Sequence, residues 1–545
     1  MIARDFDWRF LLPTPGGGSY RHLVLLGGSQ DLADYALDRG VAREVSQRFP
    51  AQPIADAIVL FNRAQVDLYM AVQSLRPGGV LYAEFKHGLK FGDVQFLPGI
   101  RRTLARAGAT QMGVYWCTPD FERHDAYVPL GSPEAIRWYL SNFYVGALRR
   151  QILGSVLRVL AGFGEAACSS SVRRFAVTAI AGPLGDARPS LLGDLSLPGD
   201  LRHPRSQLLV VAPGNRRVVL LPFAERGEYP LCALKLTRDS SRNARAESEQ
   251  LVLASVYARL DDSMRRTIPR PYGCLRWGHL TASIEGAVPG RLLLTSRRDR
   301  TQRSVEILRR VAAWVVEFQR QTEVRRIRWG ESASNAALAA ALVEYSALFG
   351  ETAEQHALFD EIVRRSSQLV DAPIPVVWMH GDLHPGNIHL SLNQVGVLDW
   401  VDGGEGPPFL DLFRFVLEWR AHIRGFKSAV ARVRNFEEIF LQQGCQDSLV
   451  LAAREEIARY SAALEVDSGL IPVLLPLLWI QRAVRHRHKA DQGRSATHRS
   501  IAALATQYVC AMAANPELLF AGHLQAIGSR RSAASQVHAP GLRRR

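Results

Sequence analysis

Residues 376–388, with the sequence VVWMHGDLHPGNI, are the most informative segment of the chain. An apolar run leads there into a polar loop, in which Asp382 and Asn387 stand five positions apart. A second apolar run, residues 395–398, is followed at once by Asp399. This pattern predicts a strand, a loop and a short hairpin, and such an arrangement brings three oxygen-bearing side chains to one place.

Phosphoryl transfer from a nucleoside triphosphate requires groups of these kinds. A carboxylate must lie where the acceptor hydroxyl loses its proton. An amide oxygen and a second carboxylate must hold Mg²⁺ against the phosphates, because Mg²⁺ prefers hard oxygen ligands and keeps part of its water. The segment is therefore a candidate site for a reaction of this class.

Residues 380–387 (HGDLHPGN) resemble the catalytic loop of the aminoglycoside phosphotransferase and choline kinase family, whose members are related to the protein kinases. Residues 397–400 (VLDW) resemble that family's metal-binding segment, the counterpart of the kinase D-F-G motif. The resemblance implies that Asp382 is the catalytic base or orients the acceptor hydroxyl. It also implies that Asn387 and Asp399 are metal ligands, and that ATP and Mg²⁺ are the cofactors.

The same resemblance gives two residues a supporting role. His380 is expected to buttress the loop, and Asp411, within residues 407–412 (PPFLDL), matches an acidic residue that supports it. Residues 283–292 (SIEGAVPGRL) resemble the segment that links the two lobes of the family's fold, where main-chain groups would meet adenine. An ordinary loop between two elements explains that stretch nearly as well.

The nucleotide-binding half is expected upstream of the loop. The family places a lysine on the third strand of a small sheet, where it meets the α- and β-phosphates and pairs with a helix glutamate. Lys235 lies in such an apolar run, in a chain that has only five lysines. Its partner is expected to be Glu247 or Glu249. We prefer Glu249, since its helix face then continues into an apolar stripe of Leu253, Val256 and Leu260.

The loop expected to cover the phosphates is residues 211–217, and it departs from the G-x-G-x-x-G pattern. Related small-molecule kinases vary at this loop as well. The departure therefore leaves the resemblance of the catalytic segment in place.

Residues 1–150 alternate short apolar runs with helical patterns, which is typical of an α/β domain. Residues 74–84 (SLRPGGVLYAE) resemble the late helix, turn and strand of class I methyltransferases, which use S-adenosylmethionine. Residues 25–29 (LLGGS) lie where the glycine-rich loop of that family would be, but they lack its acidic residue and spaced glycines. We therefore expect a shortened methyltransferase-like domain that has lost methyl transfer, in which Gly27 and Gly28 form a tight turn.

Five regions are expected along the chain. They are a degenerate methyltransferase-like α/β domain at 1–150, a basic amphipathic helix and linker at 151–205, a kinase-like N-lobe at 206–290, a kinase-like C-lobe with the catalytic loop at 291–525 and a disordered basic tail at 526–545. The fold class is thus an α/β Rossmann-like domain followed by an α+β two-lobed protein-kinase-like domain with a mainly helical C-lobe. The helix at 149–160 is expected to pack on a neighbouring domain, in preference to a membrane surface.

The composition excludes several other classes. The formal net charge is +15, yet no zinc-finger spacing or other nucleic-acid-binding motif occurs, so no nucleic-acid partner is expected. The six cysteines lie far apart without a C-x-x-C pair, which indicates a reducing compartment. The longest apolar run, residues 470–480, is too short to span a membrane, and the first residues resemble no secretory signal. A cytoplasmic protein is expected.

Together these features predict ATP- and Mg²⁺-dependent transfer of a phosphate to a hydroxyl of a small molecule, such as a sugar, amino sugar, glycan or amino alcohol. Two alternatives remain. One is a catalytically silent kinase-like module that binds nucleotide or regulates a partner, and the other is an active methyltransferase with an appended kinase-like domain. The acceptor and the oligomeric state stay open. Trp419 and Trp479 could form a wall for a cationic acceptor, although burial in the core is the favoured fate of each.

Overall fold

The chain folds into two compact units. A computed structural model describes residues 6–12, 19–61, 67–86, 96–119, 121, 125–143, 148–182, 198–201, 206–211, 217–295, 301–491 and 496–521. The first unit comprises Met1–Leu251 and Pro269–Pro289, and the second comprises Val252–Ile268 and Gly290–Arg545.

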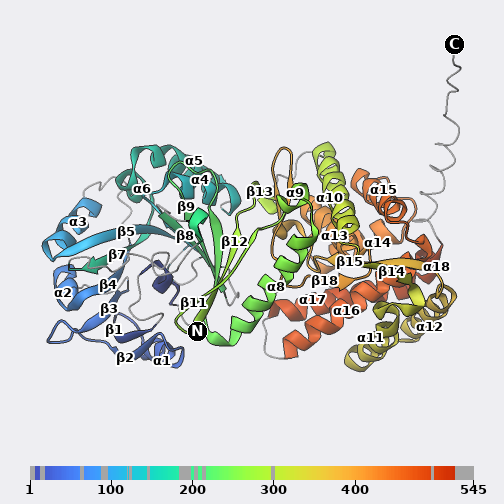
Figure 1. Ribbon diagram of the computed structural model, residues 1–545, viewed down its shortest axis with the longest axis horizontal. Coiled ribbons are helices and arrows are strands. Elements are labelled where there is room, and N and C mark those ends of the chain that lie inside the picture. Colours follow the sequence, from blue (N-terminus) through green and yellow to red (C-terminus); the bar gives the residue numbers. More distant parts are fainter. Residues whose placement is uncertain are drawn as a thin grey trace, which may run out of the picture. The chain divides into compact units, whose positions relative to one another are not determined.

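The first unit is built on one twelve-stranded sheet, in the order β11-β12-β10-β9-β8-β6-β5-β7-β4-β3-β1-β2 (Figure 1). Its strands are β1 (Tyr20–Leu26), β2 (Ala42–Ser46), β3 (Ala55–Leu60), β4 (Leu75–Lys86), β5 (Ala109–Thr118), β6 (Ala126–Pro129), β7 (Arg174–Ala181), β8 (Ser206–Val211), β9 (Arg217–Phe223), β10 (Cys232–Thr237), β11 (Pro271–Trp277) and β12 (Leu280–Gly286). Strands β2, β1, β3 and β4 run parallel to one another, and the other neighbours are antiparallel. All six residues of β3 are buried, as expected for a parallel strand covered on both faces.

The helices of the first unit cover the two faces of this sheet unequally. They are α1 (Gln30–Asp38), α2 (Leu68–Gln73), α3 (Phe96–Arg106), α4 (Pro133–Asn142), α5 (Leu148–Leu160), α6 (Glu165–Ser171) and the start of α8 (Asn243–Arg259). One face packs against α2 to α6, through buried side chains such as Leu104, Trp138 and Leu157. On the other face the short helix of Asp7–Leu11 supplies Trp8, whose ring stacks on Tyr82 at a centroid distance of 5.3 Å.

The prediction for residues 151–205 is incomplete. The expected amphipathic helix is α5, but the same interval also contains β7, which lies between β4 and β5 in the middle of the sheet. Its sequence, RFAVTAIA, mixes β-branched and apolar residues, a composition that is typical of a strand. Much of the predicted linker, residues 183–197 and 202–205, lies outside the described residues, as does the predicted tail at 526–545.

The sheet also crosses two predicted domain boundaries. Strand β8, from the region predicted as a kinase-like N-lobe, pairs with β6 from the N-terminal region through Tyr127↔Leu209 and Ala126↔Val210. The regions predicted as separate domains at 1–150 and 206–290 therefore contribute strands to a single sheet. Pairing between strands so far apart in sequence leaves no local signal, and the separate-domain prediction is corrected on this point.

The second unit is mainly helical. Its helices are the end of α8, α9 (Asp262–Arg265), α10 (Thr301–Gln321), α11 (Ala333–Phe349), α12 (Ala353–Gln368), α13 (Leu410–Arg424), α14 (Ala429–Phe440), α15 (Ser448–Ala463), α16 (Ile471–Asp491), α17 (Ala496–Ala514) and α18 (Pro516–Phe520). Two three-stranded sheets accompany them, β13-β16-β17 and β14-β15-β18. Their strands are β13 (Arg291–Leu292), β14 (Arg325–Arg328), β15 (Pro373–Met379), β16 (Ile388–Leu390), β17 (Val395–Val397) and β18 (Gly404–Gly406).

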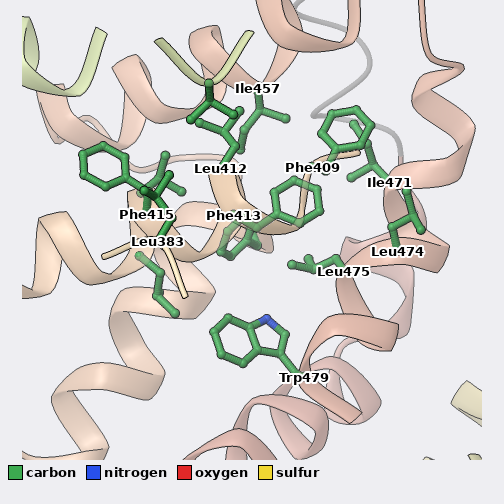
Figure 2. Close-up of a cluster of buried hydrophobic side chains, with 14 of the residues drawn as sticks. Leu383, Phe409, Leu412, Phe413, Phe415, Ile457, Ile471, Leu474, Leu475 and Trp479 are labelled. Atoms are coloured by element: carbon green, nitrogen blue, oxygen red, sulfur yellow. The ribbon is translucent and has the colours of Figure 1, made fainter. Parts of the chain in front are cut away.

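A single hydrophobic core holds these helices together and anchors the predicted catalytic loop. Figure 2 shows Leu383 among the aromatic and aliphatic side chains of α13, with Trp479 of α16 at the edge of the same cluster. Leu383 is fully buried, so the residue that follows Asp382 fixes the loop to the core. Trp419 and Trp479 are both buried, in agreement with the favoured expectation for each.

No helix within the described residues combines the length and the hydropathy that crossing a bilayer requires.

Candidate functional site

The predicted catalytic loop begins directly after β15 and is held by one buried carboxylate. Asp411, in the first turn of α13, accepts hydrogen bonds from the backbone N–H groups of His380 (2.7 Å) and Gly381 (2.9 Å). Burial raises the pKa of Asp411, whereas the nearby His380 and these backbone hydrogen bonds oppose that rise. The contact is the supporting role that the sequence predicted for Asp411.

Glycine is required at position 381. Its φ is +75°, in the left-handed region, and a Cβ atom there would collide with the carbonyl oxygen of Asp402. The residue between His380 and Asp382 must therefore lack a side chain. This requirement explains why the loop reads H-G-D.

His380 links the loop to the segment that carries Asp399. Its Nδ1 accepts from the backbone N–H of Asp382 at 3.2 Å, and its Nε2 contacts the carbonyl oxygen of Leu398 at 2.8 Å. These partners fit a neutral imidazole with its proton on Nε2. His380 thus connects the backbone of Leu398, which precedes Asp399, to the backbone N–H of Asp382.

Asn387 and Asp399 lie at the same end of the β16–β17 hairpin. Ile388 pairs with Val397, so Asn387 immediately precedes one strand while Asp399 follows the other. The backbone N–H of Leu398 donates to the carbonyl oxygen of Asn387 at 2.8 Å, and the Asn387 amide N–H donates to the carbonyl oxygen of Asp382 at 3.1 Å. The Asn387 side chain therefore uses its amide nitrogen to hold the loop. Its amide oxygen is the atom suited to bind a cation.

The donors at this end of the hairpin fit Mg²⁺. One amide oxygen and one carboxylate are hard ligands, and Mg²⁺ is commonly held by one or two protein oxygens together with substrate phosphates. Asp399 has a φ of +63°, an uncommon backbone conformation for a residue other than glycine. Among the described residues no cluster of three or more His, Cys, Asp or Glu side chains could bind a metal by itself.

Asp382 lies between two arginines and a histidine. Arg414 Nη1 contacts its Oδ1, Arg482 Nη1 lies 3.9 Å from the same oxygen, and His384 Nε2 lies 3.5 Å from Oδ2. Burial alone would raise the pKa of Asp382, but the hydrogen bond from His384 and the charge of Arg414 lower it far below its usual range. Asp382 is therefore ionised at neutral pH and is suited to accept a hydrogen bond from an acceptor hydroxyl.

Neither arginine was identified from the sequence. Arg414 lies three residues after Asp411 on α13, so helical spacing puts the two on one side of the helix and could have drawn attention to it. Arg482 lies on α16, a hundred residues after Asp382, and no local pattern connects the two. A cavity of about 280 Å³ also borders this region, lined by Met379, Glu405 and Gln481 among others, and Asp382 does not line it.

The residues predicted to position the nucleotide lie in the first unit. Lys235 is on β10, between Val219 of β9 and Ser283 of β12. Its Nζ lies 2.6 Å from Glu249 Oε1 and 2.8 Å from Glu285 Oε1. Lys235 is therefore held between two buried carboxylates, Glu249 and Glu285. The sequence did not predict the contact with Glu285.

Glu249, and not Glu247, lies beside the lysine. Burial would raise the pKa of Glu249, but Lys235 and then Arg217 more than offset this effect and lower that pKa to about 2. Arg217, the first residue of β9, contacts the second carboxylate oxygen of Glu249. Glu247 pairs instead with Arg276 at 2.7 Å, and its side chain is 40% exposed.

The two glutamates of α8 offer a matched pair of substitutions. Glu249→Ala removes a buried carboxylate that compensates two cations, so we expect the free energy of unfolding to fall by about 3–5 kcal/mol. Glu247→Ala removes an exposed ion pair and should change it by less than about 0.5 kcal/mol. Urea unfolding followed by circular dichroism measures both, and equal losses in the two variants would contradict the arrangement.

The remaining predicted features of this half are only partly described. The centre of the expected phosphate-covering loop, residues 212–216, lies outside the described residues. Residues 283–292, expected to link two lobes, include the point between Pro289 and Gly290 at which the chain passes from the first unit to the second.

The region that carries these residues is similar to a known protein family. Residues 233–447 match the model of the phosphotransferase enzyme family. This range includes Lys235, Glu249, Asp382, Asn387 and Asp399. It ends before Arg482. No curated protein matches the chain.

Several solved structures are similar to part of the chain. A choline/ethanolamine kinase family protein from Mesorhizobium loti is 13% identical, with 61% of this chain and 96% of that chain covered and a TM-score of 0.36. Aminoglycoside phosphotransferase APH(4)-Ia is 11% identical, covering 56% and 95% of the two chains, with a TM-score of 0.37. Macrolide 2'-phosphotransferase MphH from Brachybacterium faecium is 18% identical, covering 53% and 89%, with a TM-score of 0.31.

Proposed function

We propose that this chain is a phosphotransferase that uses ATP and Mg²⁺ to phosphorylate a hydroxyl group of a small molecule. The observation that carries the proposal is the set of contacts that joins Asp382, Asn387 and the backbone before Asp399 into one hydrogen-bonded loop. The match of residues 233–447 to the phosphotransferase enzyme family supports the same reaction class.

In the proposed reaction, Asp382 accepts a hydrogen bond from the acceptor hydroxyl and orients its oxygen. That oxygen forms a bond to the γ-phosphorus while the bond to ADP breaks, and the hydroxyl proton passes to Asp382. A base with so low a pKa removes the proton late, which suits a loose transition state that requires little deprotonation beforehand. Most of the rate then comes from positioning and charge stabilisation.

Asn387 and Asp399 would hold Mg²⁺, which when bound neutralises charge on the phosphates. Lys235 would contact the phosphates, with its ammonium group held by Glu249 and Glu285.

The proposal is tested by acceptor-dependent ADP release. The chain of residues 1–545 is incubated with ATP, Mg²⁺ and a panel of hydroxyl-bearing metabolites, and ADP is measured with and without each acceptor. At least one acceptor should raise ADP release well above the acceptor-free rate. Nucleotide binding in a thermal-shift assay, without ADP release on any acceptor, would instead favour the catalytically silent module.

We also propose that the N-terminal region is a shortened methyltransferase-like domain that no longer binds S-adenosylmethionine. In support, the chain goes from β1 out to β2 and back to β3 on the other side of β1, which creates a topological switch point of the kind where such sheets bind ligands. Gly27 has a φ of +80°, as a tight turn requires, and a Cβ atom at Gly28 would lie only 3.3 Å from the ring of Phe61. That ring takes up space beside the turn.

Calorimetric titration of the full chain with S-adenosylmethionine should give no binding heat, and saturable binding would revive the methyltransferase alternative.

A further inference from the structure

Arg482 is a largely buried cation beside the proposed catalytic group. Its side chain is 15% exposed, and its nearest carboxylate oxygen is Asp382 Oδ1, at 3.9 Å. Within the described part of the chain, its guanidinium makes no hydrogen bond with a protein acceptor. A guanidinium carries five N–H donors, and those of Arg482 are not among the fully buried unpartnered atoms, so they remain accessible to a ligand. Arg482 therefore offers donors that a ligand oxygen could satisfy.

Asp382 does not meet this need, because Arg414 already engages it. Arg414 Nη1 contacts Asp382 Oδ1 and also lies 3.3 Å from the carbonyl oxygen of Gly381. Arg414 Nε is buried and has no hydrogen-bond partner in the described part of the protein. Arg414 also acts electrostatically on Asp411. Asp382 is thus the carboxylate that faces both arginines, and Arg414 is its closer partner.

The other charged groups around Arg482 do not balance it. Glu418 also acts on it, but both Glu418 oxygens lie 3.1 Å from Arg432 Nη1. Arg485, one helical turn along α16, adds positive charge. Burial and the charge of Arg414 lower the pKa of Arg482 to about 10, so it stays protonated at neutral pH.

His486 supports the same electrostatic picture. Burial and then the charge of Arg482 lower the pKa of His486 to about 3, so this residue is neutral and adds no charge of its own. Trp419 and Trp479, the aromatic side chains considered as a binding surface for a cationic acceptor, are buried in the core. On the α16 side, Arg482 and Arg485 therefore make the surroundings of Asp382 electropositive, and neither of these tryptophans is exposed there.

We propose that the acceptor is an anionic alcohol, which carries a phosphate or carboxylate group near its reactive hydroxyl, and that Arg482 binds this group. The proposal rests on the phosphotransferase function proposed above. A bidentate contact with the guanidinium would satisfy the donors of Arg482 and place the hydroxyl next to Asp382. A cationic amino alcohol or amino sugar would meet the positive charges of Arg414 and Arg482.

The test compares acceptors that differ in charge and little else. Glucose, glucosamine, glucuronate and glucose 6-phosphate serve as neutral, cationic and two anionic probes, alongside glycerol and glycerate. We expect kcat/KM, measured by ADP release, to be at least about tenfold higher for anionic members than for their neutral or cationic counterparts, because a charge-assisted contact is gained. ADP release confined to neutral or cationic acceptors would overturn the proposal and leave the phosphotransferase function intact.

The role of Arg482 is tested separately by substitution. Arg482→Gln should raise KM for the anionic acceptor about 10- to 100-fold, with KM for ATP unchanged. The control is Arg487→Gln on the same helix, since Arg487 is exposed and pairs with Asp491 at 3.1 Å; it should match the unmodified protein. A rise in KM for ATP instead would mean that Arg482 contacts the phosphates of the nucleotide, which would overturn the acceptor assignment.

A binding measurement in the absence of ATP tests the anion site independently of the phosphotransferase reaction. Calorimetric titration of the unmodified protein with the anionic probes, in the absence of ATP, should show binding that Arg482→Gln weakens about 10- to 100-fold and Arg487→Gln retains. If such binding is present while no acceptor supports ADP release, the anion site stands and the phosphotransferase function fails. If none of the anionic probes binds or reacts while a neutral or cationic probe does, the anion site fails alone.

Discussion

Asp382→Ala is expected to lower kcat by about 10²- to 10⁴-fold, the range that a positioned proton acceptor contributes. The effect should be this large because Asp382 is the carboxylate in the loop that is both ionised and partly exposed, with 29% of its side chain accessible. KM for ATP and the affinity for ATP should change little, since the nucleotide is assigned to other residues. Initial-rate kinetics with calorimetric titration of ATP separate the two effects.

The alanine variant removes the counter-charge of Arg414, and it can lose stability for that reason. Asp382→Asn keeps the volume and one acceptor oxygen, so it provides a second variant with a smaller structural change. Thermal unfolding should show that the asparagine variant is folded at the assay temperature. Full activity in that folded variant would remove Asp382 from its proposed role.

Asp399→Asn is expected to lower kcat by at least about 100-fold and to raise the Mg²⁺ concentration needed for half-maximal activity. A metal contributes several kcal/mol of charge stabilisation in reactions of this kind, and the neutral amide is a weaker ligand than a carboxylate. Asparagine tolerates the left-handed backbone conformation at this position, where φ is +63°, so the substitution tests the charge and not the turn.

Asp402→Asn is the matched control for this experiment. It removes a carboxylate three residues further along the same loop, outside the proposed ligand pair. Titration of Mg²⁺ in the presence of ATP, followed by calorimetry, gives a readout that does not depend on turnover. If Asp399→Asn and Asp402→Asn shift the Mg²⁺ dependence equally, Asp399 is not a specific ligand.

The loop around Asp382 was predictable because its signals are local. The glycine at 381, the asparagine five residues after Asp382 and the hairpin that ends before Asp399 are all set within about twenty residues of sequence. Backbone sterics and strand pairing act over this distance. Lys235 and Glu249 were also predictable, since an apolar strand and an amphipathic helix place both side chains inward.

Features that depend on long-range pairing were missed. The joining of β6 and β8 into one sheet involves strands about eighty residues apart, with no turn between them to mark the connection. Strand β7 was overlooked, although its β-branched residues were visible, because it follows a helix in a region that ends in glycine and proline. The contact of Arg482 with Asp382 requires α16 to lie against the loop that carries Asp382, which only tertiary packing decides.

The arginines beside Asp382 also account for an unusual combination of properties. The Asp382 carboxylate, proposed to be catalytic, is held by the Arg414 guanidinium, which also keeps its pKa low and makes it a weak base. Such a group suits a reaction in which the hydroxyl is positioned first and loses its proton late. The same positive charge would favour an acceptor that brings a negative charge of its own.

The most direct test is the rate of ADP release by the chain of residues 1–545, in unmodified form and as Asp382→Asn. The rate is measured in four conditions, with and without acceptor and with Mg²⁺ or excess EDTA. We expect rapid release only when acceptor and Mg²⁺ are both present, a product heavier than the acceptor by one phosphate, and a large loss in the variant. ADP release that ignores the acceptor, or that survives unchanged in Asp382→Asn, would contradict the assignment.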